Sequence, residues 1–319
     1  HNEIYVTEQD AINVIPSLSE IYDEPFADSS QIPTYLVSKL ARSKVTVALS
    51  GDGGDELFGG YNRYTITNNL FKKINIFPKS IRKTISKGLL QFSEPTWDLF
   101  FKKLYSKNYA NIGFKIHKGA NALSYDSLQD LHYRLASTID NPSNWLLVCD
   151  EPKTILNNDN DKFNQLDDIE KMMAYDILTF LPTDILTKVD RAAMHNSLET
   201  RVPFLDLNVV NFAASMPLTY KIRGGEGKWA LRKILYKYIP KDIIERPKMG
   251  FGVPLDDWLK GPLKDWSENL LDHNALIEDN IFDAGFLNNI WQDHLHGKQN
   301  HGHQLWNVLM FQEWLRKNV

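Results

Sequence analysis

Short β-rich segments alternate with helical segments along residues 1–64. The strand-like pieces are "EIYV" and "VTVAL", and the stretches "DAINVIPSLSEIY" and "TYLVSKLARS" repeat apolar residues at helical spacing. This alternation predicts a parallel sheet with crossover helices. Val45, Val47 and Leu49 suit a β-strand, and we expect that strand to be buried and parallel.

The rest of the chain is predicted to be largely helical. Residues 65–165 are basic and aromatic, with a helix expected after Pro78, and long helical patterns fill residues 166–319. The last of these patterns, "LWNVLMFQEWL", predicts a helix that packs in the core. We therefore divide the chain into an α/β portion (1–64), a helical insert (65–165) and a helical remainder (166–319).

Composition narrows the class of protein. The chain has 319 residues and a net charge of −4, so no basic field marks nucleic acid as the partner. The lysines and arginine between Lys72 and Lys87 favour a solvated helical face over a polyanion site. No apolar run approaches the roughly 20 residues that span a bilayer, so no membrane partner is expected. Cys149 has no second cysteine to pair with, which fits a reducing compartment, and we expect a cytoplasmic location.

The stretch "VTVALSGDGGDELFGGY" joins the predicted strand to a helix through an acidic, glycine-rich turn. Free backbone N–H groups at such a turn commonly cradle an anion, although Asp55-Glu56 stands where a Walker A loop needs Gly-Lys-Ser/Thr. The carboxylates of Asp52, Asp55 and Glu56 would repel phosphates unless Mg²⁺ lay between them; one of them could instead act as a base. A surface loop with a capping Asp remains the plain alternative.

The segment "ALSGDGGDELFGGYNRY" resembles the signature of the asparagine synthetase family, in particular the synthetase domain of its glutamine-dependent members. Other matches are "EPFADSSQIPTYLVSK" upstream and, downstream, "LPTDILTKVDRAAMHNSLETRVPFLD", "GKWALRK" and "RPKMGFGVPLDDWL". The resemblance covers most of the chain and is weakest at about 65–165. It implies an adenine nucleotide α hydrolase-like (ATP pyrophosphatase) α/β fold with a large helical portion. It also implies a ligase that activates a carboxylate as an acyl-adenylate, which ammonia then attacks.

The resemblance assigns roles by position. Ser50 and Gly51 match the backbone segment that holds ATP, and Asp55 matches the acidic residue placed for Mg²⁺ and pyrophosphate. Asp52 and Lys228 match catalytic positions. There the acid supports formation of the acyl-adenylate or the attack on it, and the lysine neutralises the phosphates as pyrophosphate leaves.

Two further groups follow from the same resemblance. Arg232 lies at i+4 from Lys228 on the same helical face and is expected to assist in binding the nucleotide. Asp28, Ser29 and Ser30 fall in a segment that lines the acyl-substrate region of the family.

Other polar residues favour structural roles. Asp190–Arg191 and Glu199–Arg201 are expected to form ion pairs that hold the fold, and Asp206 is expected to cap the next helix. Cys149 lies on an apolar run and is expected to be a buried small residue. Four histidines resemble metal ligands in spacing, but with no cysteine and one adjacent acid they do not favour a zinc site. They are His294, His296, His301 and His303.

Two parts that the resemblance implies are missing from the sequence. Nothing corresponds to the glutaminase half with its cysteine nucleophile, or to the Ser-Gly-Gly-x-Asp-Ser pyrophosphate loop. The chain starts near the family's third strand without an initiator Met, and we expect it to be part of a longer protein. We therefore expect a sheet that is incomplete at its N-terminal end and weak or absent ATP binding by this chain alone.

The main hypothesis is a carbon–nitrogen ligase of the asparagine synthase (glutamine-hydrolysing) type. It would use aspartate, ATP, Mg²⁺ and ammonia from glutamine, and family members often form homodimers. Asp52 stands where asparagine-forming members often have Glu, which leaves open another carboxylate, such as a sugar uronic acid in surface-polysaccharide synthesis. A nucleic-acid-modifying ATP pyrophosphatase and a non-catalytic fragment that carries only protein contacts are the alternatives of other classes.

Overall fold

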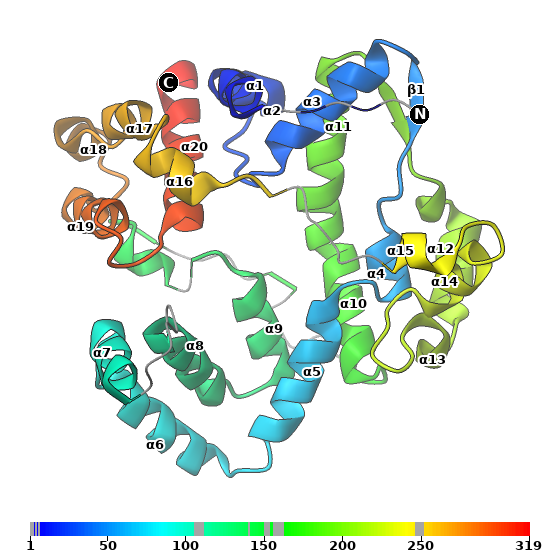
Figure 1. Ribbon diagram of the computed structural model, residues 1–319, viewed down its shortest axis with the longest axis horizontal. Helices are drawn as coiled ribbons and strands as arrows, with labels where there is room; N and C mark the ends of the chain where they lie inside the picture. The colour runs from blue at the N-terminus through cyan, green and yellow to red at the C-terminus, as the bar shows by residue number, and fades with distance from the viewer. Residues whose placement is uncertain are drawn as a thin grey trace. The chain divides into compact units, whose positions relative to one another are not determined.

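The computed structural model describes residues 3, 5, 7–104, 112–139, 141–149, 154–155, 163–245 and 252–319. Within these ranges the chain is mainly helical and has one small parallel sheet, an α/β arrangement (Figure 1). It forms two compact units. The first comprises His1–Gly60, Thr138–Pro152 and Met173–Val319, and the second comprises Tyr61–Ser137 and Lys153–Met172.

The predicted N-terminal helices are confirmed. Helix α1 (Glu8–Val14) begins at Thr7, whose side chain accepts a hydrogen bond from the backbone N–H of Asp10. The turn η1 (Ile15–Ser17) carries the chain into α2 (Leu18–Tyr22), and α3 (Gln31–Arg42) follows after a loop. Apolar side chains from each of these elements, among them Val14, Ile15, Tyr22 and Ile32, are buried in the main core of the first unit.

The sheet consists of β1 (Val47–Leu49) and β2 (Glu199–Arg201), which run parallel with Val47 opposite Glu199. The predicted parallel strand is therefore confirmed, but its predicted burial is wrong. The exposed fractions are 45% for Val45, 37% for Val47 and 74% for Leu49. Parallel strands are usually buried because layers cover both faces, whereas β1 pairs with a single strand in the part of the chain that the structure describes.

The predicted strand "EIYV" is only partly testable. Ile4 and Val6 lie outside the described residues, and Glu3 and Tyr5 do not belong to a strand. The sheet of the described ranges thus has fewer strands than the alternating pattern of residues 1–64 predicts.

The middle of the first unit positions the candidate site. Helix α4 (Gly54–Phe58) follows β1, and the 3-10 turn η5 (Pro203–Leu205) follows β2. The other elements here are α10 (Asp168–Leu178), which starts in the second unit, η4 (Leu181–Leu186), α11 (Thr187–His195), α12 (Leu207–Ser215), α13 (Leu218–Lys221), α14 (Trp229–Leu235) and α15 (Lys241–Ile244). The segment η4 is a π-helical turn that leads directly into α11.

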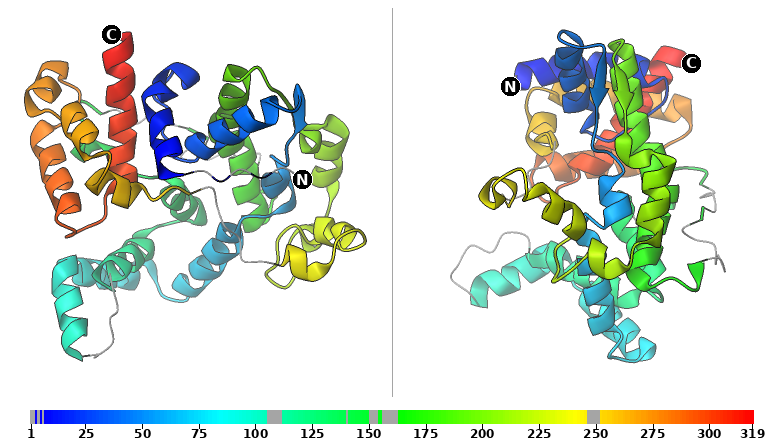
Figure 2. Two further views of the ribbon diagram at one scale, coloured as in Figure 1. Left: turned by 45° about the horizontal axis from the view of Figure 1, so that its top comes forward. Right: turned by 90° about the vertical axis from the view of Figure 1, so that its right-hand side faces the viewer.

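The C-terminal part of the first unit is a group of helices around α20 (Gly302–Asn318). The others are α16 (Leu255–Lys260), α17 (Lys264–Leu270), α18 (His273–Asp279) and α19 (Ala284–Leu295). Helix α20 contacts α2, α16 and α17 (Figure 2). Leu305, Leu309 and Gln312 are 0% exposed, which confirms the predicted core helix.

The second unit is helical. Its helices are α5 (Asn62–Ile74), α6 (Lys79–Leu90), α7 (Glu94–Leu104), α8 (Ile112–Ser124) and α9 (Leu128–Ala136). Helix α6 begins directly after Pro78, as predicted, and packs on α8, while α5 packs on α9 around Ile74, Ala122 and Leu131. Across both units, none of the described helices is long and apolar enough to cross a membrane.

Candidate functional site

The acidic turn after β1 has the predicted strand–turn–helix form. Gly53 adopts a φ of 77°, and a Cβ atom on it would lie 2.6 Å from Cδ2 of Leu205. Only glycine fits such a left-handed, crowded position. Asp55 and Glu56 occupy the first turn of α4, where the helix dipole favours negative charge.

Ser50 holds the start of this turn to the sheet. Its backbone N–H donates to the carbonyl of Arg201 at 2.9 Å, which extends the pairing of β1 with β2. Its side-chain Oγ is buried and has no hydrogen-bond partner among the described residues. Buried hydroxyls without a partner are uncommon, so this atom is available to a bound ligand. The neighbouring Gly51 is exposed, and a Cβ on it would meet no atom of the described residues within 4 Å.

Lys228 reaches the acidic turn from a distant part of the sequence. Its Nζ lies 2.7 Å from Oδ2 of Asp55, and its backbone N–H donates to the carbonyl of Phe58 at 3.0 Å. A Cβ atom on Gly54 would lie 3.7 Å from the same Nζ. The structure thus places together the cation and the carboxylate that the sequence assigns to one phosphate site. Asp52 is half-buried in the turn that leads to them.

Glycines allow this close approach. A Cβ on Gly227 would lie 2.1 Å from the carbonyl oxygen of Gly59. A Cβ on Gly60 would lie 2.0 Å from Oδ1 of Asp55 and 2.4 Å from Cε of Lys228. Lys228 itself has a φ of 56°, a left-handed conformation that costs a non-glycine residue about 1 kcal/mol or more. Strain of this kind is concentrated at functional sites.

Arg232 contacts the backbone and a carboxylate of its own surroundings. Its Nε donates to the carbonyl of Gly227 at 3.0 Å, and its Nη1 lies 2.5 Å from Oε1 of Glu245. The hydroxyl of Tyr236 donates to the same Glu245 oxygen. Hydrogen bonds from Tyr236 and then from Arg232 lower the pKa of Glu245. The guanidinium therefore holds the backbone beside Lys228.

The segment of Asp28, Ser29 and Ser30 belongs to a different cluster. Asp28 Oδ1 accepts from the backbone N–H of Ser30 at 2.9 Å, and Oδ2 accepts from its hydroxyl at 2.7 Å. Oδ2 also lies 2.5 Å from Nζ of Lys188, which is 3.6 Å from Asp184. Ser29 is buried next to these groups in sequence. The cluster ties the loop before α3 to η4 and α11.

The two carboxyl groups of this cluster respond differently to burial. For Asp28, burial raises the pKa, but the charge of Lys188 and the hydrogen bonds from Lys188 and Ser30 outweigh it and leave the pKa lowered. For Asp184, burial and then the negative charge of Asp28 raise the pKa to about 7. Burial also raises the pKa of Tyr22, whose hydroxyl donates to the carbonyl of Lys188 at 3.2 Å.

Several of the structural predictions can be checked directly. The side chain of Asp206 accepts from the backbone N–H of Asn208 at 2.9 Å, which confirms it as the N-cap of α12. Arg201 Nε lies 2.6 Å from Glu199 Oε1, but both side chains are more than half exposed, so this pair holds the fold only weakly. Cys149 is half-buried, so the prediction of a buried residue is wrong.

The histidines near the C-terminus form a local contact. The backbone N–H of His301 donates to Nδ1 of His294 at 3.2 Å, and both side chains are buried. Burial lowers the pKa of each of these imidazoles. In the described ranges no group of three or more His, Cys, Asp or Glu side chains is arranged to hold a metal ion.

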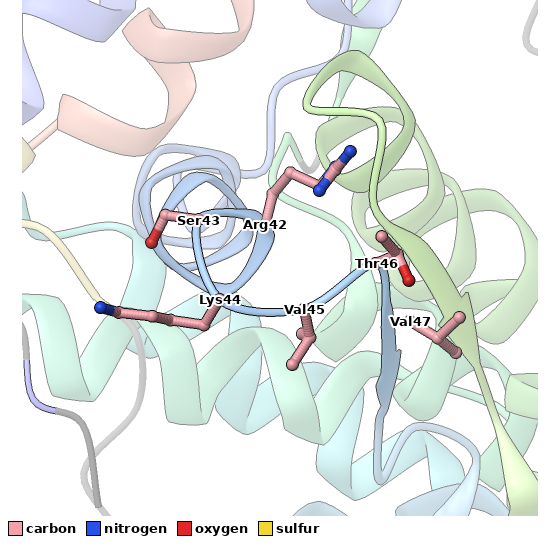
Figure 3. A pocket seen from close by; sticks show the side chains of 6 residues that line it. All are labelled: Arg42, Ser43, Lys44, Val45, Thr46 and Val47. Atoms are coloured by element: carbon pink, nitrogen blue, oxygen red, sulfur yellow. The ribbon is translucent and has the colours of Figure 1, made fainter.

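A hollow of about 430 Å³ lies elsewhere, on the connection from α3 to β1 (Figure 3). Its lining consists of Arg42, Ser43, Lys44, Val45, Thr46 and Val47. None of these residues belongs to the predicted site. The candidate site therefore depends on the Asp55–Lys228 contact and not on this hollow.

The sequence interpretation missed four residues that the structure connects to the predicted ones. Lys188 contacts Asp28 and is itself close to Asp184, and Glu245 contacts Arg232 and accepts from Tyr236. The i,i+4 spacing of Asp184 and Lys188 is a recognisable helix ion pair and could have indicated the first contact. The contacts of Glu245 and Asp28 join distant segments and leave no local signal.

Comparison with known proteins gives a family for the whole chain. The model of the asparagine synthase family matches residues 1–316. The chain belongs to the asparagine synthase family. This confirms the resemblance drawn from the sequence motifs.

Individual relatives agree with this assignment. Asparagine synthetase [glutamine-hydrolyzing] 1 of Bacillus subtilis (strain 168) is 32% identical over 316 residues, covering 98% of this chain and 47% of the relative. A protein of Mycobacterium bovis, provisionally named as a glutamine-hydrolysing asparagine synthetase, is 29% identical over 97% of this chain and 45% of its own length. The carboxyethyl-arginine beta-lactam-synthase of Streptomyces clavuligerus is 28% identical over 122 residues, which cover 38% of this chain and 22% of that enzyme. The chain spans about half the length of the first two.

Proposed function

We propose that this chain is the synthetase part of an ATP-dependent, amide-forming enzyme that converts aspartate and ammonia from glutamine into asparagine, AMP and pyrophosphate. The observation that carries the proposal is the 2.7 Å contact of Lys228 Nζ with Asp55 Oδ2 beside a glycine-rich turn. Membership of the asparagine synthase family supports the reaction class. The adenine nucleotide α hydrolase-like fold belongs to the same proposal.

The residues present fit a magnesium-bound nucleotide. Mg²⁺ is usually held by one or two carboxylates together with phosphate oxygens and water, so Asp55 suffices as a protein ligand. The unpartnered Oγ of Ser50 and the exposed backbone at Gly51 offer hydrogen bonds to phosphate or ribose oxygens. Mg²⁺, when bound, would supply charge neutralisation on the phosphates.

Lys228 would stabilise the leaving pyrophosphate. With Asp55 as a ligand of the metal, the ammonium group of Lys228 would be free to contact a phosphate instead of the carboxylate. A compact point charge on a flexible stem suits this change of partner. Asp52, in the same turn, would support formation of the acyl-adenylate or the attack of ammonia on it.

The segment of Asp28, Ser29 and Ser30 is proposed to line the acyl-substrate region. Lys188, which also faces Asp184, holds Asp28 in place, so this carboxylate would fix the conformation of the segment. The two serines would then supply hydroxyl and backbone contacts to the substrate. Arg232 would contribute through the backbone that bears Lys228.

Pyrophosphate release tests the reaction. In the natural full-length protein with aspartate, ATP and glutamine, Lys228→Ala should lower the rate about a hundredfold or more, because it removes a charge that stabilises the transition state. Lys237→Ala, an exposed lysine on the same segment, is the matched control and should retain the wild-type rate. A Lys228→Ala protein that is folded and fully active would contradict the proposal.

A second candidate reaction is amidation of another carboxylate, such as a sugar uronic acid in surface-polysaccharide synthesis. Two observations favour it: Asp52 is one methylene shorter than Glu, and one relative carries the name of a β-lactam-forming enzyme. Pyrophosphate release across a panel of carboxylates separates the candidates. Release with a uronic acid and none with aspartate would replace the main proposal.

We also propose a setting for the whole protein. A glutaminase domain would supply the ammonia, and a homodimer in the cytoplasm is the proposed state. The coverage of 47% of the Bacillus subtilis protein leaves room for such a domain in a protein of that length. Sequencing of the coding region around this segment, and the mass of the purified protein in solution, test these points.

A further inference from the structure

We propose that Arg232, Glu245 and Tyr236 form a brace that fixes the backbone conformation of Lys228, so that Arg232 is a positioning residue and does not contact the phosphates. The inference rests on the proposed function for the ligand that Lys228 meets. The brace itself is a property of the chain and can be tested without that ligand.

The brace acts on a single peptide group, the one that joins Gly227 to Lys228. Its carbonyl oxygen accepts from Nε of Arg232 at 3.0 Å. Its N–H, which belongs to Lys228, donates to the carbonyl of Phe58 at 3.0 Å. Both polar ends of one peptide plane are therefore held, and rotation of that plane would break both hydrogen bonds.

Rotation of this plane changes φ of Lys228. The residue has a φ of 56°, which a lysine rarely adopts without outside support. A hydrogen bond from a charged donor is stronger than one from a neutral donor, so the guanidinium is well suited to hold this conformation. In turn, the left-handed backbone directs Nζ of Lys228 to Asp55 at 2.7 Å.

Glu245 and Tyr236 hold the guanidinium in position. Glu245 lies just after α15 and places Oε1 2.5 Å from Nη1 of Arg232. Tyr236 lies one helical turn after Arg232 and donates its hydroxyl to the same oxygen. These contacts use Nε and one N–H of Nη1, so they fix the direction of the guanidinium, which points to Gly227 and Glu245.

The alternative is that Arg232 and Glu245 form an ordinary surface ion pair. Such pairs usually contribute little to stability. A charge exchange distinguishes the two. In the double variant Arg232→Glu with Glu245→Arg, opposite charges still face each other, but glutamate cannot donate to the Gly227 carbonyl. Arg232→Met removes both contacts, and Arg232→Lys keeps a donor of the same charge.

Two measurements are made on the natural full-length protein. Hydrogen exchange of peptides covering residues 223–229 reports opening of the Lys228 amide, and isothermal titration with Mg²⁺-pyrophosphate reports the site. Arg232→Met and the charge exchange should each speed exchange and weaken pyrophosphate affinity about tenfold. Arg232→Lys should recover part of both losses. The control Lys298→Met, which breaks the 2.9 Å ion pair with Asp293, should change neither.

Three other outcomes would contradict either the brace or the proposed function. Full recovery by the charge exchange would show that the ion pair, and not the carbonyl contact, is what matters. Weakened pyrophosphate affinity with unchanged exchange would show that Arg232 binds phosphate directly. If the wild-type protein does not bind pyrophosphate, the proposed function fails, and the exchange rates still decide whether the brace exists.

Discussion

Two of the lysine–aspartate contacts in the first unit differ in their surroundings. Lys228 and Asp55 lie 2.7 Å apart, with 29% and 31% of their side chains exposed. Lys188 and Asp28 lie 2.5 Å apart, and only 11% of the lysine side chain is exposed. Lys188 also faces a second carboxylate, Asp184, at 3.6 Å.

The difference separates a pair that can change partners from one that cannot. A partly exposed ion pair contributes little to stability, so Lys228 can leave Asp55 for another anion at low cost. A desolvated lysine between two carboxylates has no such freedom, because removing either Lys188 or Asp28 leaves an uncompensated charge. Although the two distances are similar, the Lys228–Asp55 pair suits a ligand site and the Lys188–Asp28 pair stabilises the fold.

Replacement of the two lysines by methionine should separate them most strongly. Lys188→Met should lower the free energy of unfolding by about 3 kcal/mol, because it leaves Asp28 charged, largely desolvated and without its cation. Lys228→Met should lower it by about 1 kcal/mol or less. Urea unfolding of both variants at pH 8 measures the difference. Equal losses would contradict the comparison.

The backbone beside Lys228 should be less tolerant than its side chain. Gly227→Ala places a methyl group 2.1 Å from the Gly59 carbonyl, a backbone atom that cannot turn aside. We expect a loss of about 1 to 3 kcal/mol, with faster exchange in residues 223–229. Gly88→Ala, which meets no atom within 4 Å in α6, is the control and should be neutral or stabilising. Unfolding curves that coincide for the two variants would count against the close approach.

The buried cluster should also respond to pH. The pKa of Asp184 is raised to about 7, first by burial and then by Asp28. Protonated Asp184 favours the folded state. This contribution to the free energy of unfolding is present in full below about pH 4 and is lost as pH rises toward 7. Asp184→Asn should gain stability relative to wild type between pH 5 and pH 8, by roughly 2 kcal/mol.

The quantity to measure is the difference in unfolding free energy between the wild type and Asp184→Asn. His294 and His301 have lowered pKa values, so their contribution to stability rises with pH in part of the same window. Both proteins contain these histidines, so their contribution cancels in the difference. Unfolding free energies of wild type and variant at three pH values suffice. A constant difference from pH 5 to pH 8 would show that Asp184 keeps an ordinary pKa.

The smallest expected effect on stability is that of Gly60→Ala. Its new methyl group would lie 2.0 Å from Asp55 Oδ1 and 2.4 Å from Lys228 Cε, which are movable side-chain atoms. Stability should fall by less than about 1 kcal/mol, while the Asp55–Lys228 contact is displaced. Titration with Mg²⁺-pyrophosphate should then show weakened binding. An unchanged affinity would show that the contact does not shape the site.

Local patterns predicted much of the fold. The helices α1, α2, α3, α6 and α20, the parallel strand at Val47–Leu49 and the cap at Asp206 all follow from periodicity, proline and capping residues. The burial of Val47 and Leu49 could not be predicted in this way. A strand pattern shows that a residue can pack against a layer, but the presence of that layer depends on other segments.

The candidate site divides along the same line. The turn of residues 50–54 and the acidic start of α4 follow from local sequence. The family motifs predicted that Lys228 acts at the same site. The engagement of Arg232 by Glu245, and of Asp28 by Lys188, joins segments that the sequence keeps apart. No pairwise signal exists in one sequence for such contacts.

By itself, the sequence determined the elements, the glycine turn and the family, because backbone sterics and helix periodicity act over a few neighbouring residues. Only the tertiary structure decided which carboxylate each lysine meets and how much water reaches the pair. Those outcomes depend on distances and burial that arise when distant segments pack together, and they separate Lys228 from Lys188.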